Sequence, residues 1–288
     1  MAEQKATQPV ARSLWLVQHQ RVGSTWFAST HLAQHPHIHM LKHGGGEACF
    51  GLFRRRISNG SLASRAGERR CFAQLRQHQE ACEARKSEAR KSRVCGWKAG
   101  ANFCPTPRCA SWLWSTLQPT VVHLYRRDML RQAISLALAR SSNVWTCPVG
   151  QSKRCHGGRP SNMVEAVFRA LLIVMREQAY TCAYMRRHAP RPWHQLAYED
   201  LDNSTSRAQA IAAVYRHVGV HDRWTGWHDV RQRQSSREAD ATSLLGAAEY
   251  KRLGARIRQA RSPLLVNLVK RLSTGQAAYQ FVGCSNED

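Results

Sequence analysis

Short apolar runs alternate with longer segments of helical periodicity along most of the chain. Residues 14–17 (LWLV) and 120–125 (TVVHLY) are mostly apolar or β-branched, as expected of strands that are buried on both faces of a sheet. Residues 94–98 and 193–198 predict two further strands. Because strands separated by helices favour a parallel sheet, the pattern predicts an α/β fold in which helices flank that sheet.

Apolar positions at helical spacing follow most of the predicted strands. They predict one helix that starts at Ser24, one that has Asp128 as its N-cap, and one over residues 206–219. Asn162, followed three residues later by Glu165, is typical of a capping box at the start of a long helix.

The length of 288 residues is enough to bury one large core, so we expect a single domain over residues 1–288. Residues 54–93 contain twelve Lys and Arg but only four Glu, and they predict charged surface helices inserted into that domain. We interpret this insertion either as a cap over a substrate site or as a solvated surface segment. Residues 141–160 are rich in Gly, Ser, Pro and Cys and predict a mobile loop.

The turn over residues 18–23, between the first strand and its helix, has the composition of an anion-binding site. Unpaired backbone N–H groups at a helix start bind anions, Arg21 adds a charge, and Ser24 and Thr25 add hydroxyl groups. A Walker loop would need a second glycine and a lysine before the hydroxyl residue, and both are absent. Taken alone, the stretch fits equally well an ordinary strand-to-helix turn with Ser24 as N-cap.

A second strand-to-helix corner carries Arg127. Ser135 follows eight residues later, which is about two turns along the predicted helix. An arginine at the corner and a serine on the helix are able to contact one phosphate that lies across the helix.

Both stretches resemble the cofactor-binding signatures of sulfotransferases that use 3′-phosphoadenosine 5′-phosphosulfate (PAPS). Residues 21–26 (RVGSTW) resemble the loop that binds the 5′-phosphosulfate, usually written [KR]-S-G-[ST]-[ST]-W. Residues 127–135 (RDMLRQAIS) resemble the 3′-phosphate signature, and residues 126–145 are similar to the bacterial-type branch that includes trehalose-sulfating enzymes. Val22 departs from the family, which usually has serine there and thus one more side-chain donor.

The resemblance implies a nucleotide-kinase-like fold and a metal-free transfer of a sulfuryl group from PAPS to a hydroxyl, or less readily an amine, of a carbohydrate or another small molecule. It also implies that the acids of the segment Tyr198-Glu199-Asp200-Leu201 fix a turn or a neighbouring arginine. The cofactor contacts that it implies are Arg21, Val22, Gly23, Ser24, Thr25, Trp26, Arg127 and Ser135, together with Arg231 and Arg233 in a basic loop.

Two catalytic candidates also follow from the resemblance. Glu47 lies where the family places the residue that takes the proton of the acceptor, and Lys98 lies where a strand-end lysine stabilises the transferring group. Glu47 is equally compatible with a solvated loop glutamate, and Lys98 with an ordinary lysine at the end of a strand.

The formal net charge of +24 keeps two other functional classes open. A non-catalytic polyanion- or nucleic-acid-binding protein would explain the charge, but the basic residues are spread along the chain and indicate no specific nucleic-acid partner. A P-loop kinase-like enzyme would need a Walker lysine, which is absent. The identity of the acceptor stays open, and an oligomer is compatible with the sequence.

The chain contains ten cysteines, none of them in a C-x-x-C pair, so a zinc site is not supported. The first thirteen residues are polar, and no apolar run reaches eighteen residues, so we expect a cytoplasmic protein with free thiols. In an oxidising compartment the pairs Cys104/Cys109 and Cys147/Cys155 would be candidate disulfides. The five histidines between residues 31 and 43 are predicted to lie on the surface rather than to bind a metal.

Overall fold

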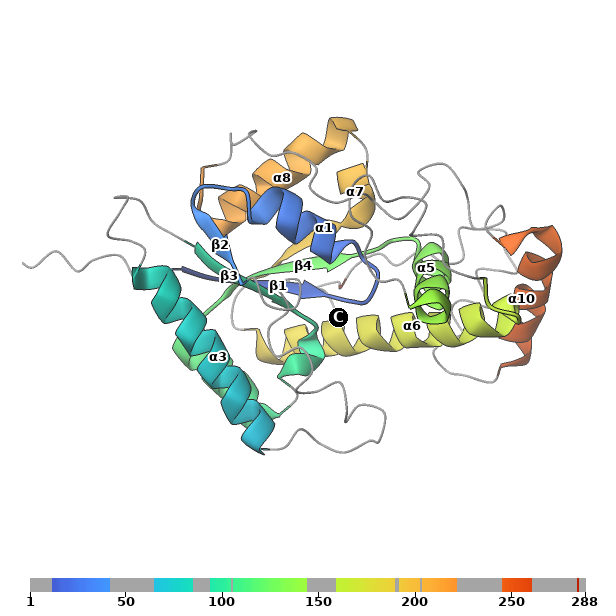
Figure 1. The fold of residues 1–288 in the computed structure, drawn as a ribbon, viewed down its shortest axis with the longest axis horizontal. Helices are drawn as coiled ribbons and strands as arrows, with labels where there is room; N and C mark the ends of the chain where they lie inside the picture. Colours follow the sequence, from blue (N-terminus) through green and yellow to red (C-terminus); the bar gives the residue numbers. More distant parts are fainter. Residues whose placement is uncertain are drawn as a thin grey trace, which may run out of the picture.

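The sheet has five parallel strands in the order β2-β3-β1-β4-β5 (Figure 1). The computed structural model describes residues 12–41, 65–84, 94–104, 106–143, 159–189, 192–202, 204–221, 245–260 and 284. The strands are β1 (Arg12–Gln18), β2 (Ile38–Met40), β3 (Val94–Ala99), β4 (Thr120–Tyr125) and β5 (His194–Ala197). The predicted α/β architecture, a parallel sheet flanked by helices, is confirmed.

The central strands are buried on both faces, which explains their continuous apolar runs. Leu16 of β1 lies opposite Lys98 of β3 on one side and Val122 of β4 on the other. All six residues of β3 are buried, including Lys98. A strand in this position has no solvent-facing side, so its sequence shows no apolar–polar alternation.

Helices cover the two faces of the sheet in separate layers. They are α1 (Ser24–Phe27), which a π-helical turn over Ala28–Leu32 continues, α3 (Arg65–Ala84), α4 (Pro107–Trp112), α5 (Met129–Ser142), α6 (Met163–His188), α7 (Tyr198–Asp202), α8 (Ser204–Val218) and α10 (Ala247–Gln259). One face carries α1, α7 and α8, and the other carries α3 and α6 (Figure 1). Residues of α5 and α10 pack against α6 in a further apolar cluster. The long helix α6 therefore joins the sheet to this outer cluster.

Helix caps agree with the sequence. The Asp128 carboxylate accepts a hydrogen bond from the backbone N–H of Arg131 at 2.8 Å, and the side-chain oxygen of Asn162 accepts one from the backbone N–H of Glu165 at 3.1 Å. The strand β5 ends at Ala197, one residue earlier than expected, and Tyr198 already belongs to α7. Within the predicted charged insertion, the structure describes α3. The predicted loop lies almost wholly outside the described residues, which resume at residue 159.

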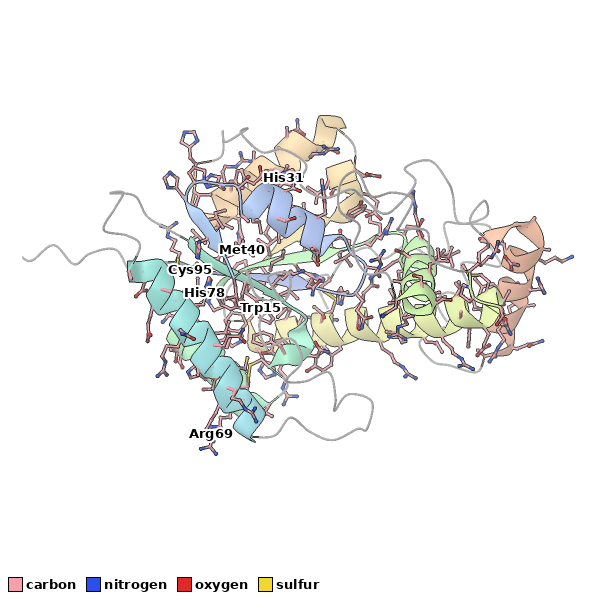
Figure 2. The ribbon with its side chains drawn as sticks, viewed as in Figure 1. Trp15, His31, Met40, Arg69, His78 and Cys95 are labelled. Atoms are coloured by element: carbon pink, nitrogen blue, oxygen red, sulfur yellow. A yellow bond between two sulfur atoms is a disulfide. The ribbon has the colours of Figure 1, made fainter. Side chains whose placement is uncertain are left out.

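The prediction of free thiols is wrong. Disulfides join Cys82 to Cys95, Cys104 to Cys109, and Cys182 to Cys284, and no cysteine in the described ranges is free. The disulfide between Cys82 and Cys95 joins α3 to β3, and Figure 2 shows His78 of α3 close to Cys95 of β3. The pair Cys104/Cys109 was a candidate from the sequence, whereas the pairs Cys82–Cys95 and Cys182–Cys284 depend on how the elements pack, which the spacing of cysteines does not reveal. The pair Cys147/Cys155 lies outside the described residues.

The histidines near the first helix are not all on the surface. His31 and His35 are buried, against the prediction, and the His35 ring packs 4.6 Å from that of Tyr215. Across the described ranges, no three His, Cys, Asp or Glu side chains lie close enough together to hold a metal ion. In the same ranges, none of the helices combines the length and the apolar character needed to cross a bilayer.

The disulfide between Cys82 and Cys95 generates a stability prediction. It closes a loop with a sequence separation of 13, against 5 for Cys104–Cys109. Because a longer loop loses more entropy on closure, replacing both Cys82 and Cys95 by serine should lower the free energy of unfolding by about 3 kcal/mol. Replacing Cys104 and Cys109 should lower it by about 2 kcal/mol. Urea denaturation of both double variants measures these losses, and an unchanged midpoint would show that the disulfides do not form.

Candidate functional site

The turn over residues 18–23 lies at the carboxyl end of β1, where ligands bind in open parallel sheets. Its backbone is left-handed at Arg21, with φ of 64°, and at Gly23, with φ of 79°. Turns of this kind present backbone N–H groups to anions. Gly23 is the N-cap of α1, and no side chain in the described part of the chain caps the first N–H groups of that helix. The N-cap is therefore Gly23 and not Ser24, which was the predicted cap.

The ring of Tyr198 packs against the backbone of this turn at Gly23. A Cβ atom on Gly23 would overlap that ring, so glycine is required both by its φ angle and by space. Val22 is fully buried and packs with Tyr198 and Trp26 in an apolar cluster. The valine at this position thus adds to the apolar core.

The side chains next to the turn are held by hydrogen bonds. The ammonium group of Lys98, at the end of β3, donates to the hydroxyl of Thr25 at 2.6 Å. The hydroxyl of Ser24 donates to the side-chain carbonyl of Gln18. The structure therefore brings Lys98 to the first turn of α1, next to two of the predicted anion contacts.

The two predicted signatures meet through Arg21 and Ser135. The Arg21 Nε–H group donates to the Ser135 hydroxyl at 3.0 Å, across 114 residues of sequence. Burial and then the nearby charge of Arg126 lower the pKa of Arg21 to about 10. Two positive charges this close together favour a bound anion.

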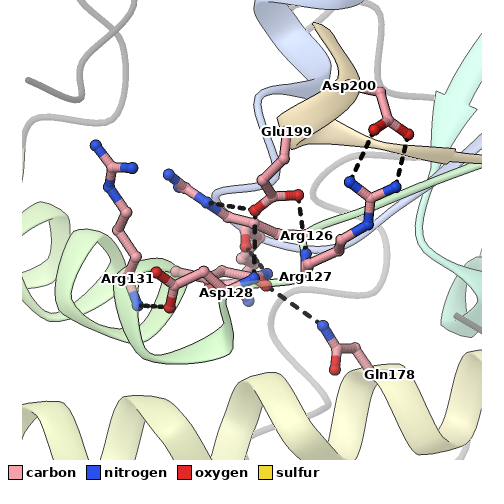
Figure 3. Close-up of polar contacts among 9 residues, drawn as sticks. Arg126, Arg127, Asp128, Arg131, Gln178, Glu199 and Asp200 are labelled. Atoms are coloured by element: carbon pink, nitrogen blue, oxygen red, sulfur yellow. Dashed lines mark hydrogen bonds and ion pairs between the residues drawn. The ribbon is translucent and has the colours of Figure 1, made fainter. Parts of the chain in front are cut away.

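Arg127 is engaged by acidic residues of α7 (Figure 3). Its guanidinium group donates to both oxygens of Asp200, at 2.7 and 2.9 Å, and this hydrogen bonding raises its pKa. Glu199 accepts from the backbone N–H groups of Arg127 and Asp128, at 3.0 and 3.2 Å. The prediction that these acids fix a turn and a neighbouring arginine is confirmed.

Sequence reasoning missed Arg126. Its side chain is only 6% exposed, and its guanidinium lies 4.9 Å from the centre of the Tyr198 ring. Its Nε lies 3.7 Å from a Glu199 oxygen and has no hydrogen-bond partner among the described residues. Within the described ranges, the Nε atom of this buried arginine therefore has an ion pair with Glu199 but no hydrogen bond. The signal was available, because consecutive residues at the end of a strand point to opposite sides, so only one of Arg126 and Arg127 faces a given site.

A histidine pair anchors the start of the turn. The Nε2 atoms of His19 and His123 lie 3.1 Å apart, so one ring donates and the other accepts. Burial lowers the pKa of His123 to about 4, and burial together with His123 lowers the pKa of His19 well below its usual value. Both rings are therefore neutral at pH 7 and tie the turn to β4.

The other predicted site residues fall into two groups. Trp26 is buried and packs with its ring edge toward Tyr198, at 6.3 Å between ring centres. Glu47, Arg231 and Arg233 lie outside the described residues.

No protein-family model matches the chain, and no curated protein matches it. Among solved structures, the chain is similar to a sulfotransferase from Alicyclobacillus acidocaldarius, with a TM-score of 0.42 and 14% sequence identity over 88% of this chain and 99% of that chain. It is also similar to the sulfotransferase domain from the curacin biosynthetic pathway, with a TM-score of 0.41 and 12% identity over 93% and 99% of the two chains. At this distance, function has to be inferred from the geometry of the site itself.

The close approach of Tyr198 to Gly23 yields a matched pair of variants. Gly23→Ala introduces both an unfavourable φ and an overlap, whereas Gly246→Ala, at φ of 81°, meets nothing within 4 Å. We expect Gly246→Ala to cost about 1 kcal/mol of stability and Gly23→Ala at least about 2 kcal/mol more, since the ring or the turn must move. Urea denaturation measures both losses. Equal losses would show that Tyr198 does not constrain the turn.

The buried histidine pair predicts a pH dependence. Because the folded-state pKa of His123 is about 4, below the unfolded value of about 6.5, the unfolded chain binds more protons between these values. The stability contributed by neutral His123 is thus complete above pH 6.5 and decreases as the pH falls toward 4. The free energy of unfolding should decrease less steeply over this range in His123→Gln than in the natural protein. If the free energy of unfolding falls equally steeply with pH in both proteins, a group other than His123 is responsible for the pH dependence.

Proposed function

We propose that this protein is a sulfotransferase that moves a sulfuryl group from PAPS to a hydroxyl group of a small-molecule or glycan acceptor. One observation carries the proposal. The hydrogen bond between Arg21 and Ser135 joins the two segments that resemble the 5′-phosphosulfate and 3′-phosphate signatures. Because β1 and β4 are neighbouring parallel strands, the segments that follow them lie at the same edge of the sheet, and this hydrogen bond supports a single ligand site there.

The residues at this corner fit a nucleotide with two anionic groups, one at the 5′ and one at the 3′ position. The backbone of residues 21–25 would hold the 5′-phosphosulfate, in a turn where a Cβ on Gly23 would fill the space taken by Tyr198. Arg126, whose Nε is buried and has no hydrogen-bond partner in the described part of the chain, would meet the 3′-phosphate together with Ser135. Arg127 stands as the second candidate for that contact, and Arg231 and Arg233 as further candidates from the basic loop.

Transfer of a sulfuryl group resembles phosphoryl transfer, in which positioning and charge stabilisation dominate. Bound PAPS supplies the sulfuryl group. Arg21 and the amides of the turn would stabilise the leaving phosphate, and Lys98 would neutralise charge on the transferring group from its place beside Thr25. Glu47 would accept the proton of the acceptor hydroxyl. The proposed mechanism uses no metal.

The disulfides favour an oxidising compartment over the cytoplasm that the sequence analysis expects. Three pairs form among the described residues, and such bonds are rare in reducing compartments. A glycan acceptor would suit such a compartment, and the similarity of residues 126–145 to trehalose-sulfating enzymes supports a sugar hydroxyl as the acceptor group.

Calorimetric titration of adenosine 3′,5′-bisphosphate (PAP) without magnesium tests the cofactor assignment. Arg126→Ala removes a buried, charge-assisted contact, so we expect it to weaken binding by roughly 2–3 kcal/mol, about 30- to 150-fold. The control variant Arg127→Ala/Asp200→Ala removes an ion pair as a unit and should change affinity less than about fivefold.

Each other outcome has a definite meaning. The reverse ranking would return the 3′-phosphate contact to Arg127, as the eight-residue spacing predicts. A protein that ignores PAP but binds magnesium ATP would be kinase-like. One that binds only nucleic acid, with a steep salt dependence, would be a polyanion-binding protein.

A further inference from the structure

The helix α6 passes beside the anion-binding turn and contacts it through Glu177. One carboxylate oxygen of Glu177 accepts from the backbone N–H of Gln20 at 3.3 Å, and the other accepts from the side-chain amide of Gln20 at 3.1 Å. Both oxygens of the carboxylate are thus used on a single residue of the turn.

The backbone carbonyl of Gln20 is bound by a residue of α5. The side chain of Gln132, which is fully buried, donates to the backbone carbonyl of Gln20 at 2.7 Å. Gln178 in turn donates to Gln132 at 3.4 Å, which links α6 to α5 (Figure 3). The backbone N–H and C=O of Gln20 are therefore both fixed by side chains from distant helices.

Fixing Gln20 matters because the next residue is strained. Arg21 has a left-handed backbone, which residues other than glycine rarely adopt without support from their surroundings. From that conformation its guanidinium group reaches Ser135 on α5. If Gln20 were released, the backbone of Arg21 would be free to relax, and the Arg21–Ser135 contact would be lost.

Glu177 does not serve to attract the ligand. A carboxylate close to an anion site repels the ligand, and burial already raises the pKa of Glu177 by disfavouring its charged form. The Glu177 side chain instead provides two acceptor oxygens within hydrogen-bond distance of Gln20.

We propose that Glu177 is a positioning residue for the anion-binding turn, and that through Gln20 it holds Arg21 in the conformation that binds the phosphates. This inference rests on the proposed function for the identity of its ligand. It assigns a role to a helix that carries none of the cofactor signatures.

Four variants separate this role from general stability. Glu177→Ala removes both acceptors, and Glu177→Asp keeps the charge but retracts it by one methylene group. Glu177→Gln preserves both hydrogen bonds, since its carbonyl accepts from the Gln20 N–H and its amide group donates to the carbonyl of the Gln20 side chain once that side chain flips. Glu165→Ala is the matched control on the same helix, because Glu165 pairs with Arg169 and Arg256 instead.

Two measurements are made on each variant: the dissociation constant for PAP by calorimetry, and the hydrogen-exchange rate of the Gln20 amide in the absence of ligand. We expect Glu177→Ala and Glu177→Asp to weaken PAP binding at least tenfold and to speed Gln20 exchange at least tenfold. Glu177→Gln should stay within threefold of the natural protein in both. Glu165→Ala should change neither, even if it lowers the unfolding midpoint.

The proposal is overturned if Glu177→Ala binds PAP normally, or if Glu177→Gln fails as badly as Glu177→Ala, which would assign the effect to charge. If the natural protein does not bind PAP at all, the proposed function fails, and hydrogen exchange alone decides the positioning role. Slow Gln20 exchange that speeds up in Glu177→Ala but not in Glu177→Gln supports the role, and equal exchange in all variants removes it.

Discussion

The site depends on a turn whose backbone is held from outside. Between β1 and α1 the backbone of Arg21 adopts the left-handed conformation, which residues other than glycine do not keep without support from their surroundings. Three successive residues of the turn are anchored to other elements: His19 to β4, Gln20 to α5 and α6, and Arg21 to α5. The anion-binding geometry is therefore a property of the packed sheet and helices, and the local sequence of the turn supplies only part of it.

The same packing distributes charge unevenly around the turn. Asp200 accepts from both terminal nitrogens of Arg127, whereas within the described ranges Arg126 lies 3.7 Å from a Glu199 oxygen and over the ring of Tyr198. Arg21 is buried near Arg126, whose charge, after burial, lowers the pKa of Arg21. Arg21 and Arg126 thus place two positive charges beside the turn, where our proposal has the nucleotide bind. Arg127 serves to fix the corner between β4 and α5.

Much of the fold could be predicted from local patterns, because buried parallel strands and capped helices leave clear signals. The apolar runs of β1 and β4 and the caps Asp128 and Asn162 are of this kind. The side-chain pairings could not be predicted in this way. The disulfide between Cys82 and Cys95 depends on how α3 packs against β3, and the choice between Arg126 and Arg127 depends on which side of β4 each faces. Glu177 lies on a helix whose pattern indicated only a buried face, so nothing in its own sequence pointed to the turn.

A crystal structure of the protein with bound PAP tests the central claim most directly. We predict that the 5′-phosphate lies within hydrogen-bond distance of the backbone N–H groups of Gly23, Ser24 and Thr25. The 3′-phosphate is predicted to lie between Arg126 and Ser135, with Gln20 still bound to Glu177. PAP found at another surface, or a 5′-phosphate outside the turn, would contradict the account.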